Sequence, residues 1–167
     1  GMAFVTENRK TEGLILDFSI LRNIALPSVD TFAKNSVINF GRLSGFADEM
    51  AKKLGVKAHS LDLEAGALSG GNQQKVVIAK WVGMNPDVII MDEPTRGIDV
   101  GAKRDIYELM NELTASGVSI IMVSSELPEV LGMSDRILVV HEGRIAGELL
   151  RDEADQEKIM TLATGGK

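Results

Sequence analysis

Short apolar runs alternate with helical patterns through the second half of the chain. The runs 88–91 and 119–123 are almost continuous in hydrophobic side chains, which is typical of strands buried on both faces of a parallel sheet. Between them, Gly117 ends a predicted helix whose apolar face recurs at i, i+3, i+4 and i+7. That face comprises Ile106, Leu109, Met110 and Leu113. A helix followed by a strand is the repeating unit of α/β folds.

Residues 72–82 predict a helix of another kind. Its apolar side chains cover nearly the whole circumference, so we expect this helix to be enclosed. Further on, Pro128 suits the first turn of a short helix. The apolar stretches 137–140 and 144–150 then predict a hairpin or two linked strands.

The first third of the chain is predicted to be helical after a starting strand at 3–5. Ser19 caps a short helix, and a second helix is marked by apolar residues three and four positions apart. These are Leu43, Phe46, Ala47, Met50 and Leu54. No strand is predicted within this helical portion. We therefore divide the chain into a leading strand and loop (1–13), a helical subdomain (14–67), an α/β core (68–150) and a helical tail (151–167).

Composition narrows the classes of protein that fit these patterns. The chain has 167 residues, and a domain holds roughly 150, so we expect a single core. A formal charge of −6 argues against a nucleic-acid partner held by phosphate contacts. The absence of cysteine excludes disulfides and thiolate metal sites. No apolar run in the sequence reaches the ~18 residues of a membrane span.

The segment Leu68–Lys75 places a serine and two glycines directly before a predicted helix. Gly70 and Gly71 allow a ligand to approach the backbone closely, and the free amides of a helix N-terminus attract an anion. The segment therefore suits a phosphate group. The alternative is an ordinary Ser69 N-cap after a glycine-rich turn.

The strand at 88–91 is followed by two adjacent carboxylates, Asp92 and Glu93. Ligands of α/β folds bind at the carboxyl ends of parallel strands, and there Asp92 can hold Mg²⁺. Glu93 can polarise an attacking water, as phosphoryl transfer requires. The alternative is a pair of solvated acids before a turn at Pro94.

Taken together, these two segments resemble the ATP-binding cassette family. Residues Leu68–Asn72 match its signature motif, with Asn72 where many members have glutamine. The resemblance implies that these residues and the following Gln73 bind nucleotide in trans. Residues 88–92 match its Walker B strand, and Asp99 matches its D-loop. The resemblance implies an α/β fold: part of a P-loop NTPase core with a parallel sheet, plus an α-helical subdomain. It also implies ATP and Mg²⁺ as ligands, with Asp92 on the metal.

Four segments narrow the resemblance to the second cassette of tandem ATPases that drive bacterial sugar importers of the ribose, xylose and galactose type. They are 7–14, 68–76, 94–103 and 124–130. The implied partners are the first cassette of the same polypeptide, a membrane permease subunit and, indirectly, an extracytoplasmic sugar-binding protein. The implied location is peripheral, on the cytoplasmic face of the inner membrane.

The family's phosphate-binding motif, G-x-x-x-x-G-K-[ST], does not occur in this sequence. This motif, called Walker A, belongs to the half of the cassette that the sequence lacks. We therefore expect the chain to be the last third of a longer protein and to bind ATP poorly by itself. In the family, the strand ending near Val123 pairs with the strand that leads into the phosphate-binding loop. Because that partner strand is missing, we also expect self-association at the open edge of the strand ending near Val123.

Two positions depart from the general cassette pattern. Glu7 occupies the position where the family usually has the Q-loop glutamine. Ser125 occupies the position of the switch histidine, which assists the catalytic Glu93. A carboxylate replaces an amide poorly beside a phosphate, and a hydroxyl does not donate as imidazole does. The resemblance therefore implies a weak site on this cassette. In the family the signature residues serve the opposite, active site in trans.

Two other readings stay open on the sequence. One is a cassette ATPase that acts outside transport. The other is a regulatory module without a P-loop that docks on an intact cassette.

Overall fold

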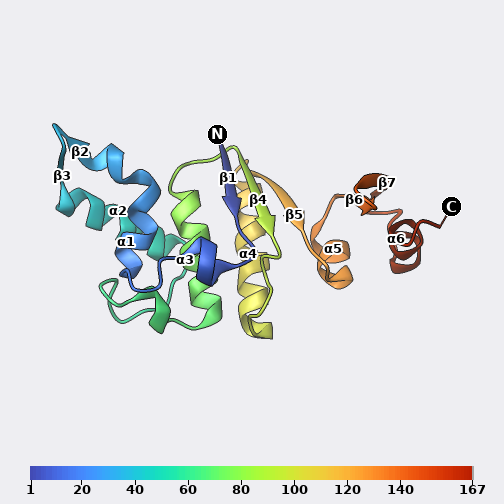
Figure 1. Ribbon diagram of the computed structural model, residues 1–167, viewed down its shortest axis with the longest axis horizontal. Coiled ribbons are helices and arrows are strands. Elements are labelled where there is room, and N and C mark those ends of the chain that lie inside the picture. The colour runs from blue at the N-terminus through green and yellow to red at the C-terminus, as the bar shows by residue number, and fades with distance from the viewer. Residues whose placement is uncertain (167) are drawn as a thin grey trace. The chain divides into compact units, whose positions relative to one another are not determined.

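The structure is a computed structural model that describes residues 1–166. Its contacts divide the chain into two compact units, Gly1–Val123 and the part that begins at Ser124 (Figure 1). The boundaries that the sequence suggested after residues 13, 67 and 150 group residues by motif instead, and they remain a prediction.

The first unit is built on a three-stranded parallel sheet (Figure 1). Its strands are β1 (Met2–Val5), β4 (Val88–Asp92) and β5 (Ser119–Val123), with β4 in the centre. Met2, Val88 and Ser119 stand in register at one end. The predicted α/β fold with a parallel sheet is confirmed.

The two faces of this sheet differ in burial. One face carries the buried side chains of Ala3, Val5, Ile89 and Met91. On the other face, Phe4, Ile121 and Val123 are 46%, 53% and 51% exposed. Among the described residues, the prediction of burial on both faces is therefore wrong for the run 119–123, and the run 88–91 is only partly buried on this second face, because the helices of the first unit cover the other face.

Two helices form the layer beside the sheet. α3 (Gly70–Val82) contacts β1, and α4 (Val100–Ala115) contacts both α3 and β5. α3 is enclosed as predicted, with every residue from Gln73 to Ala79 buried. The predicted stripe on α4 is its buried face. In the described part of the chain, no helix has the length and hydrophobicity of a membrane span.

The helical portion of the first unit wraps around α3. It consists of the π-helical turn η1 (Arg9–Gly13), α1 (Ile20–Ala25), the 3-10 helix η2 (Leu26–Phe32), α2 (Phe40–Lys53) and the 3-10 turn η3 (Ala65–Ala67). The Ser19 hydroxyl accepts a hydrogen bond from the Arg22 amide at 3.2 Å, which confirms the predicted cap of α1.

A small hairpin interrupts this portion, contrary to the prediction of no strand there. It pairs β2 (Ala33–Lys34) with β3 (Val37–Ile38). Asn35 and Ser36 both have positive φ, 51° and 63°, as a tight two-residue hairpin turn requires.

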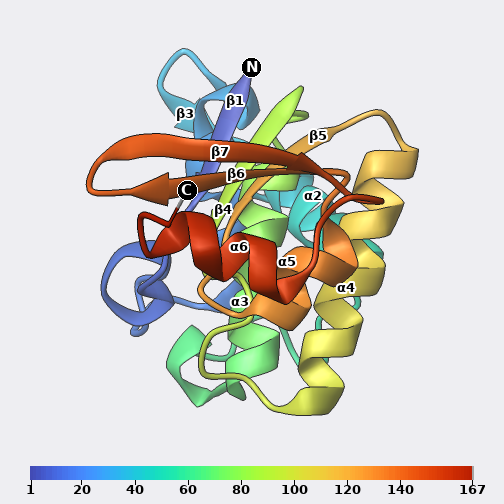
Figure 2. The ribbon, with the colours of Figure 1, turned by 90° about the vertical axis from the view of Figure 1, so that its right-hand side faces the viewer.

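The second unit combines α5 (Leu127–Met133), the antiparallel strands β6 (Arg136–His141) and β7 (Arg144–Leu150), and α6 (Gln156–Ala163). The predicted hairpin is confirmed, with Glu142 and Gly143 at its turn. Figure 2 shows α6 running along the hairpin, where Ile137, Val139 and Ile159 form the centre of a small core.

Candidate functional site

The central strand of the sheet ends at the two predicted carboxylates. Asp92 closes β4, and Glu93 follows it with φ +47°, a conformation that non-glycine residues seldom adopt. The Glu93 amide donates to the Val123 carbonyl at 2.8 Å, so pairing with the neighbouring strand holds this strained backbone. Both carboxylates are partly exposed at the carboxyl edge of the sheet.

A tight turn, Pro94–Ile98, leads from Glu93 to α4; we call it the 94–98 turn. The Arg96 amide donates to the Glu93 carbonyl at 3.1 Å, and Gly97 has φ +67°. Asp99 then caps α4, because its carboxylate accepts from the Ala102 amide at 2.9 Å. Asp99 therefore has a local role in this chain in addition to the predicted D-loop role.

The predicted phosphate segment lies at the start of α3. Ser69 occupies the N-cap position, but its hydroxyl makes no capping hydrogen bond to the first turn of the helix. It accepts instead from the Asn72 side-chain amide at 3.1 Å. The Asn72 oxygen accepts from the Lys57 amide at 2.8 Å, so this asparagine ties the signature segment to the loop before it.

Accessibility differs along this segment. Leu68, Gly70 and Asn72 are partly exposed, and Ser69 is exposed. Gln73 and Gly71 are buried. The Gln73 amide nitrogen donates to the Ala65 carbonyl at 3.2 Å, inside the unit. A ligand or partner can therefore reach the segment from Leu68 to Asn72 at its first glycine, and not at its second.

Both glycines also pack against neighbouring elements. A Cβ atom at position 71 would lie 2.5 Å from the Cβ of Ala102, at the start of α4. A Cβ atom at position 70 would lie 2.9 Å from Arg9 Nη2 and 3.3 Å from the Gly97 carbonyl oxygen. The absence of side chains therefore serves packing within this unit.

Glu7 lies beside the 94–98 turn. It forms an ion pair with the Arg96 side chain, so the segment after β1 and the 94–98 turn are linked directly. Arg9, which the sequence analysis did not single out, donates to the Arg96 and Gly97 carbonyls. Burial lowers the pKa of the Arg9 guanidinium by desolvation. Sequence alone gave no signal for these contacts, since their partners are 87 and 88 residues away.

Ser125 belongs to the second unit. It is exposed and stands between β5 and α5. The neighbouring Ser124 hydroxyl accepts from the Glu126 amide at 3.1 Å and donates to the buried Glu129 carboxylate. The structure thus gathers Glu7, the signature segment and the 92–99 segment in the first unit, and it describes Ser125 within the second.

The donor set around Asp92 fits one kind of metal. Among residues 1–166, no three acidic or histidine side chains form a cluster that would enclose an ion. Mg²⁺ is usually held by one or two carboxylates together with phosphate oxygens and water, so a single carboxylate at a strand end suits it. This arrangement requires a phosphate ligand to complete the coordination.

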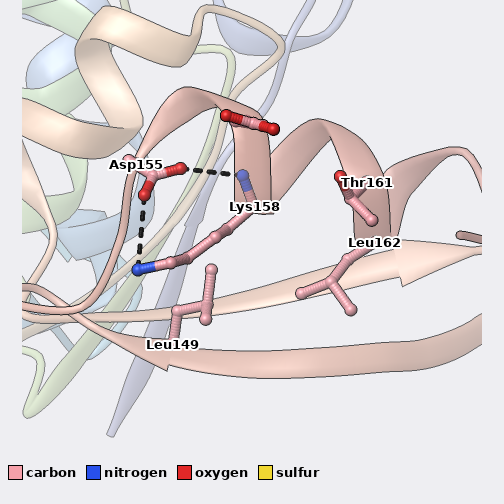
Figure 3. Close-up of a pocket in the computed structure, with 6 residues that line it drawn as sticks. Leu149, Asp155, Lys158, Thr161 and Leu162 are labelled. Atoms are coloured by element: carbon pink, nitrogen blue, oxygen red, sulfur yellow. Dashed lines mark hydrogen bonds and ion pairs between the residues drawn. The ribbon is translucent and has the colours of Figure 1, made fainter. Parts of the chain in front are cut away.

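The second unit has an open pocket of about 490 Å³ between β7 and α6 (Figure 3). Leu149 and Leu162 form its apolar part, and the polar rim includes Asp155 and Lys158. The Lys158 amide donates to the Asp155 carboxylate at 2.8 Å, and this hydrogen bond lowers the pKa of Asp155. None of the predicted site residues lines this pocket, and Asp155 at its rim serves as the N-cap of α6.

Comparison with known proteins gives a consistent result. The family described as "ABC transporter" matches residues 5–96. The ribose import ATP-binding protein of Oceanobacillus iheyensis is 64% identical over 166 residues, which are 99% of this chain and 34% of that protein. The protein of the same name from Bacillus subtilis is 64% identical over 167 residues, 100% of this chain and 34% of its own length. The chain therefore spans about a third of these relatives.

A solved structure shares the fold. The dimeric structure of a bacterial ABC transporter cassette superimposes with a TM-score of 0.75 at 25% identity. The match covers 89% of this chain and 62% of that one.

Proposed function

The chain belongs to the ABC transporter family, and we propose that it is part of the ATP-binding subunit of a sugar importer. We propose ribose as the sugar, because the relatives that match the whole chain are named ribose import ATP-binding proteins. In this proposal the chain contributes the end of a second cassette, and the same polypeptide supplies the first.

One observation carries the proposal: the two acidic residues at the end of the central strand lead into a turn that packs against the first signature glycine. Asp92 and Glu93 lead directly into the 94–98 turn, whose Gly97 carbonyl lies against Gly70. Phosphoryl transfer needs little from a protein beyond positioning and charge stabilisation. The turn holds the carboxylates of this cassette and its signature segment, which serve different nucleotides in this proposal, in a fixed relation.

The roles we assign follow from the position of each group. Asp92 would hold Mg²⁺, which when bound would supply neutralisation of the phosphate charge. Glu93 accepts a hydrogen bond from the attacking water and so orients it toward the γ-phosphorus. The left-handed backbone at Glu93 points its side chain differently from that of a residue continuing the strand.

The signature residues act on a different nucleotide in this proposal. Ser69 and Gly70 face a partner cassette, where the exposed hydroxyl and the start of α3 complete a site whose phosphate-binding loop lies on the other cassette. The dimeric cassette structure that shares this fold supports such pairing. Gln73, which is buried, acts only by holding the segment through Ala65.

The site built on this chain's own carboxylates is the weaker of the two. Glu7 replaces an amide, and its negative charge is engaged by Arg96. Ser125 replaces an imidazole and offers only a hydroxyl at the switch position. We therefore assign most of the turnover to the composite site that Ser69 and Gly70 complete.

The partners follow from the same proposal. The helical portion and the Glu7 segment contact a membrane permease subunit, which receives its sugar from an extracytoplasmic binding protein. The subunit is then peripheral, on the cytoplasmic face of the membrane.

Two measurements test this proposal. In a calorimetric titration, the 167-residue chain should bind Mg·ATP only at millimolar concentrations, because it has no phosphate-binding loop. Micromolar affinity would contradict the composite site. In cells, deleting the gene for the full-length protein should abolish ribose uptake and restoring it should recover uptake, with xylose and galactose as comparators. Ribose uptake that survives the deletion would overturn the choice of sugar.

A further inference from the structure

The Arg9 guanidinium joins two segments that are distant in the sequence. Its Nη1 donates to the Arg96 carbonyl at 2.8 Å, and its Nη2 donates to the Gly97 carbonyl at 3.1 Å. A guanidinium is planar and presents its donors in a fixed fork. Two bonds to consecutive carbonyls therefore fix both the position and the orientation of the 94–98 turn.

The first signature glycine lies against the same group. A side chain at position 70 would place its Cβ 2.9 Å from Arg9 Nη2 and 3.3 Å from the Gly97 oxygen that this nitrogen contacts. Position 70 therefore has no room for a side chain while Arg9 holds the turn. Gly70, the guanidinium and the turn form one packed group.

The positive charge of Arg9 strengthens its two hydrogen bonds to the turn. The Arg9 Nε atom is buried and has no partner within residues 1–166, so the terminal nitrogens supply the guanidinium's contacts to the turn. Hydrogen bonds from a charged donor are stronger than neutral ones, and removing such a donor leaves the carbonyls without that partner. The ion pair of Glu7 with Arg96 supports the same turn from a neighbouring position.

We propose that Arg9 is a positioning residue that fixes the 94–98 turn against Gly70. The turn joins Glu93, at the water-orienting position, to Asp99, at the D-loop position. The side-chain hydrogen bonds of Arg9 go to the turn and not to the carboxylates or the signature serine, so Arg9 acts through the turn and through its packing against Gly70. The effect on catalysis rests on the proposed function, whereas the effect on the turn does not.

Hydrogen exchange of the 167-residue chain tests the structural half. Arg9→Lys keeps the charge and replaces the fork with a single ammonium group. We expect the amides of Arg96 and Gln73, which donate to the Glu93 and Ser69 carbonyls, to exchange at least about tenfold faster in this variant, while exchange in β6 and β7 stays the same. The matched control is Lys10→Gln, at the exposed neighbouring side chain, which should leave these amides unchanged. Equal protection in Arg9→Lys and the wild type would overturn the proposal.

Kinetics of the full-length protein test the catalytic half. Arg9→Lys should lower kcat for ATP hydrolysis by about tenfold and change KM for ATP by less than about threefold, because a residue that acts through the turn affects positioning and not nucleotide binding. A change confined to KM, or a wild-type kcat despite faster exchange, would refute positioning. If the wild-type full-length protein hydrolyses no ATP, the proposed function fails, and the exchange experiment still decides whether Arg9 holds the turn.

Discussion

Gly71 is the residue at which the signature segment packs most tightly. Its missing Cβ would meet the Ala102 Cβ at 2.5 Å, closer than two carbon atoms can approach without movement. Its φ is not in the left-handed region, so alanine suits the helix itself. The requirement for glycine here comes from the approach of α4 to α3.

Gly71→Ala should therefore destabilise the chain although alanine favours helices. Overpacking of a close contact costs about 1–3 kcal/mol in the free energy of unfolding. A urea titration that follows helical circular dichroism measures this loss.

Gly45→Ala is the matched control. Gly45 lies on the exposed side of α2 with no atom within 4 Å of its missing Cβ. Here the same substitution should raise the free energy of unfolding by about 0.5–1 kcal/mol. Similar shifts at the two positions would show that α3 and α4 do not approach as described.

At this scale the sequence identified residue types better than their contacts. Ser69, Gly70, Asp92 and Glu93 stand out because hydroxyl, glycine and carboxylate follow a recognisable order. Arg9 does not, because it binds backbone carbonyls, and any residue has a carbonyl. No pattern in the chain marks which distant turn accepts from it.

Among the elements, α3 and α4 are joined by a buried charge. The Lys75 ammonium donates to the Asp105 carboxylate at 2.7 Å and to the Gly55 carbonyl, just past α2, at 3.3 Å. The Lys75 side chain is 9% exposed, and that of Asp105 is 42% exposed. Removing the carboxylate would leave an ammonium group in the interior with one neutral acceptor.

This pair predicts how stability depends on pH. The hydrogen bond from Lys75, followed by its positive charge, lowers the pKa of Asp105 below its usual value. A carboxyl group whose pKa is lower in the folded state stabilises the fold above its unfolded pKa, and loses this contribution as pH falls through the folded value. Asp105→Asn should therefore be less stable than the wild type at pH 7, with the difference shrinking below about pH 4.

Urea midpoints measured between pH 7 and about pH 3 check this dependence. Asp48→Asn is the control, since its ion pair with Lys52 lies on the exposed surface of α2 and contributes little. A difference between Asp105→Asn and the wild type that stays constant across this range would contradict the assignment.

The elements with strong periodicity were predictable, and two features were not. The β2–β3 hairpin was not predicted, because strands of two residues are too short to show a hydrophobic periodicity. Its turn is formed by Asn35 and Ser36, without the glycine that often marks a hairpin turn. The exposure of one sheet face was not predicted, because an apolar run shows only that a strand can be covered on both faces. It does not show that a covering layer lies within the same stretch of chain.

For the whole molecule, the outer edge of β5 is the feature with the clearest consequence. In the described chain β5 pairs with β4 alone, so its other edge presents unpaired backbone groups beside half-exposed Ile121 and Val123. Open edges of this kind bind other strands. We therefore retain the prediction that the isolated chain self-associates.

Sedimentation velocity at rising concentration measures this association. The wild-type chain should sediment faster as concentration increases, and Ile121→Lys should shift it toward the monomer by placing a charge on the exposed face. Val37→Lys, at a 70% exposed position of β3, is the control and should leave association unchanged. A wild-type chain that stays monomeric throughout would refute the prediction.

The central claim is that Ser69 and Gly70 complete an ATP site whose phosphate-binding loop lies elsewhere. The most direct measurement is steady-state ATP hydrolysis by the full-length protein carrying Ser69→Arg. Ser69 is exposed, so the substitution should leave folding intact while a bulky side chain blocks the start of α3. We predict a loss of roughly a hundredfold or more in kcat, the scale on which removing a charge-stabilising contact acts. A rate within about twofold of the wild type would contradict the composite site.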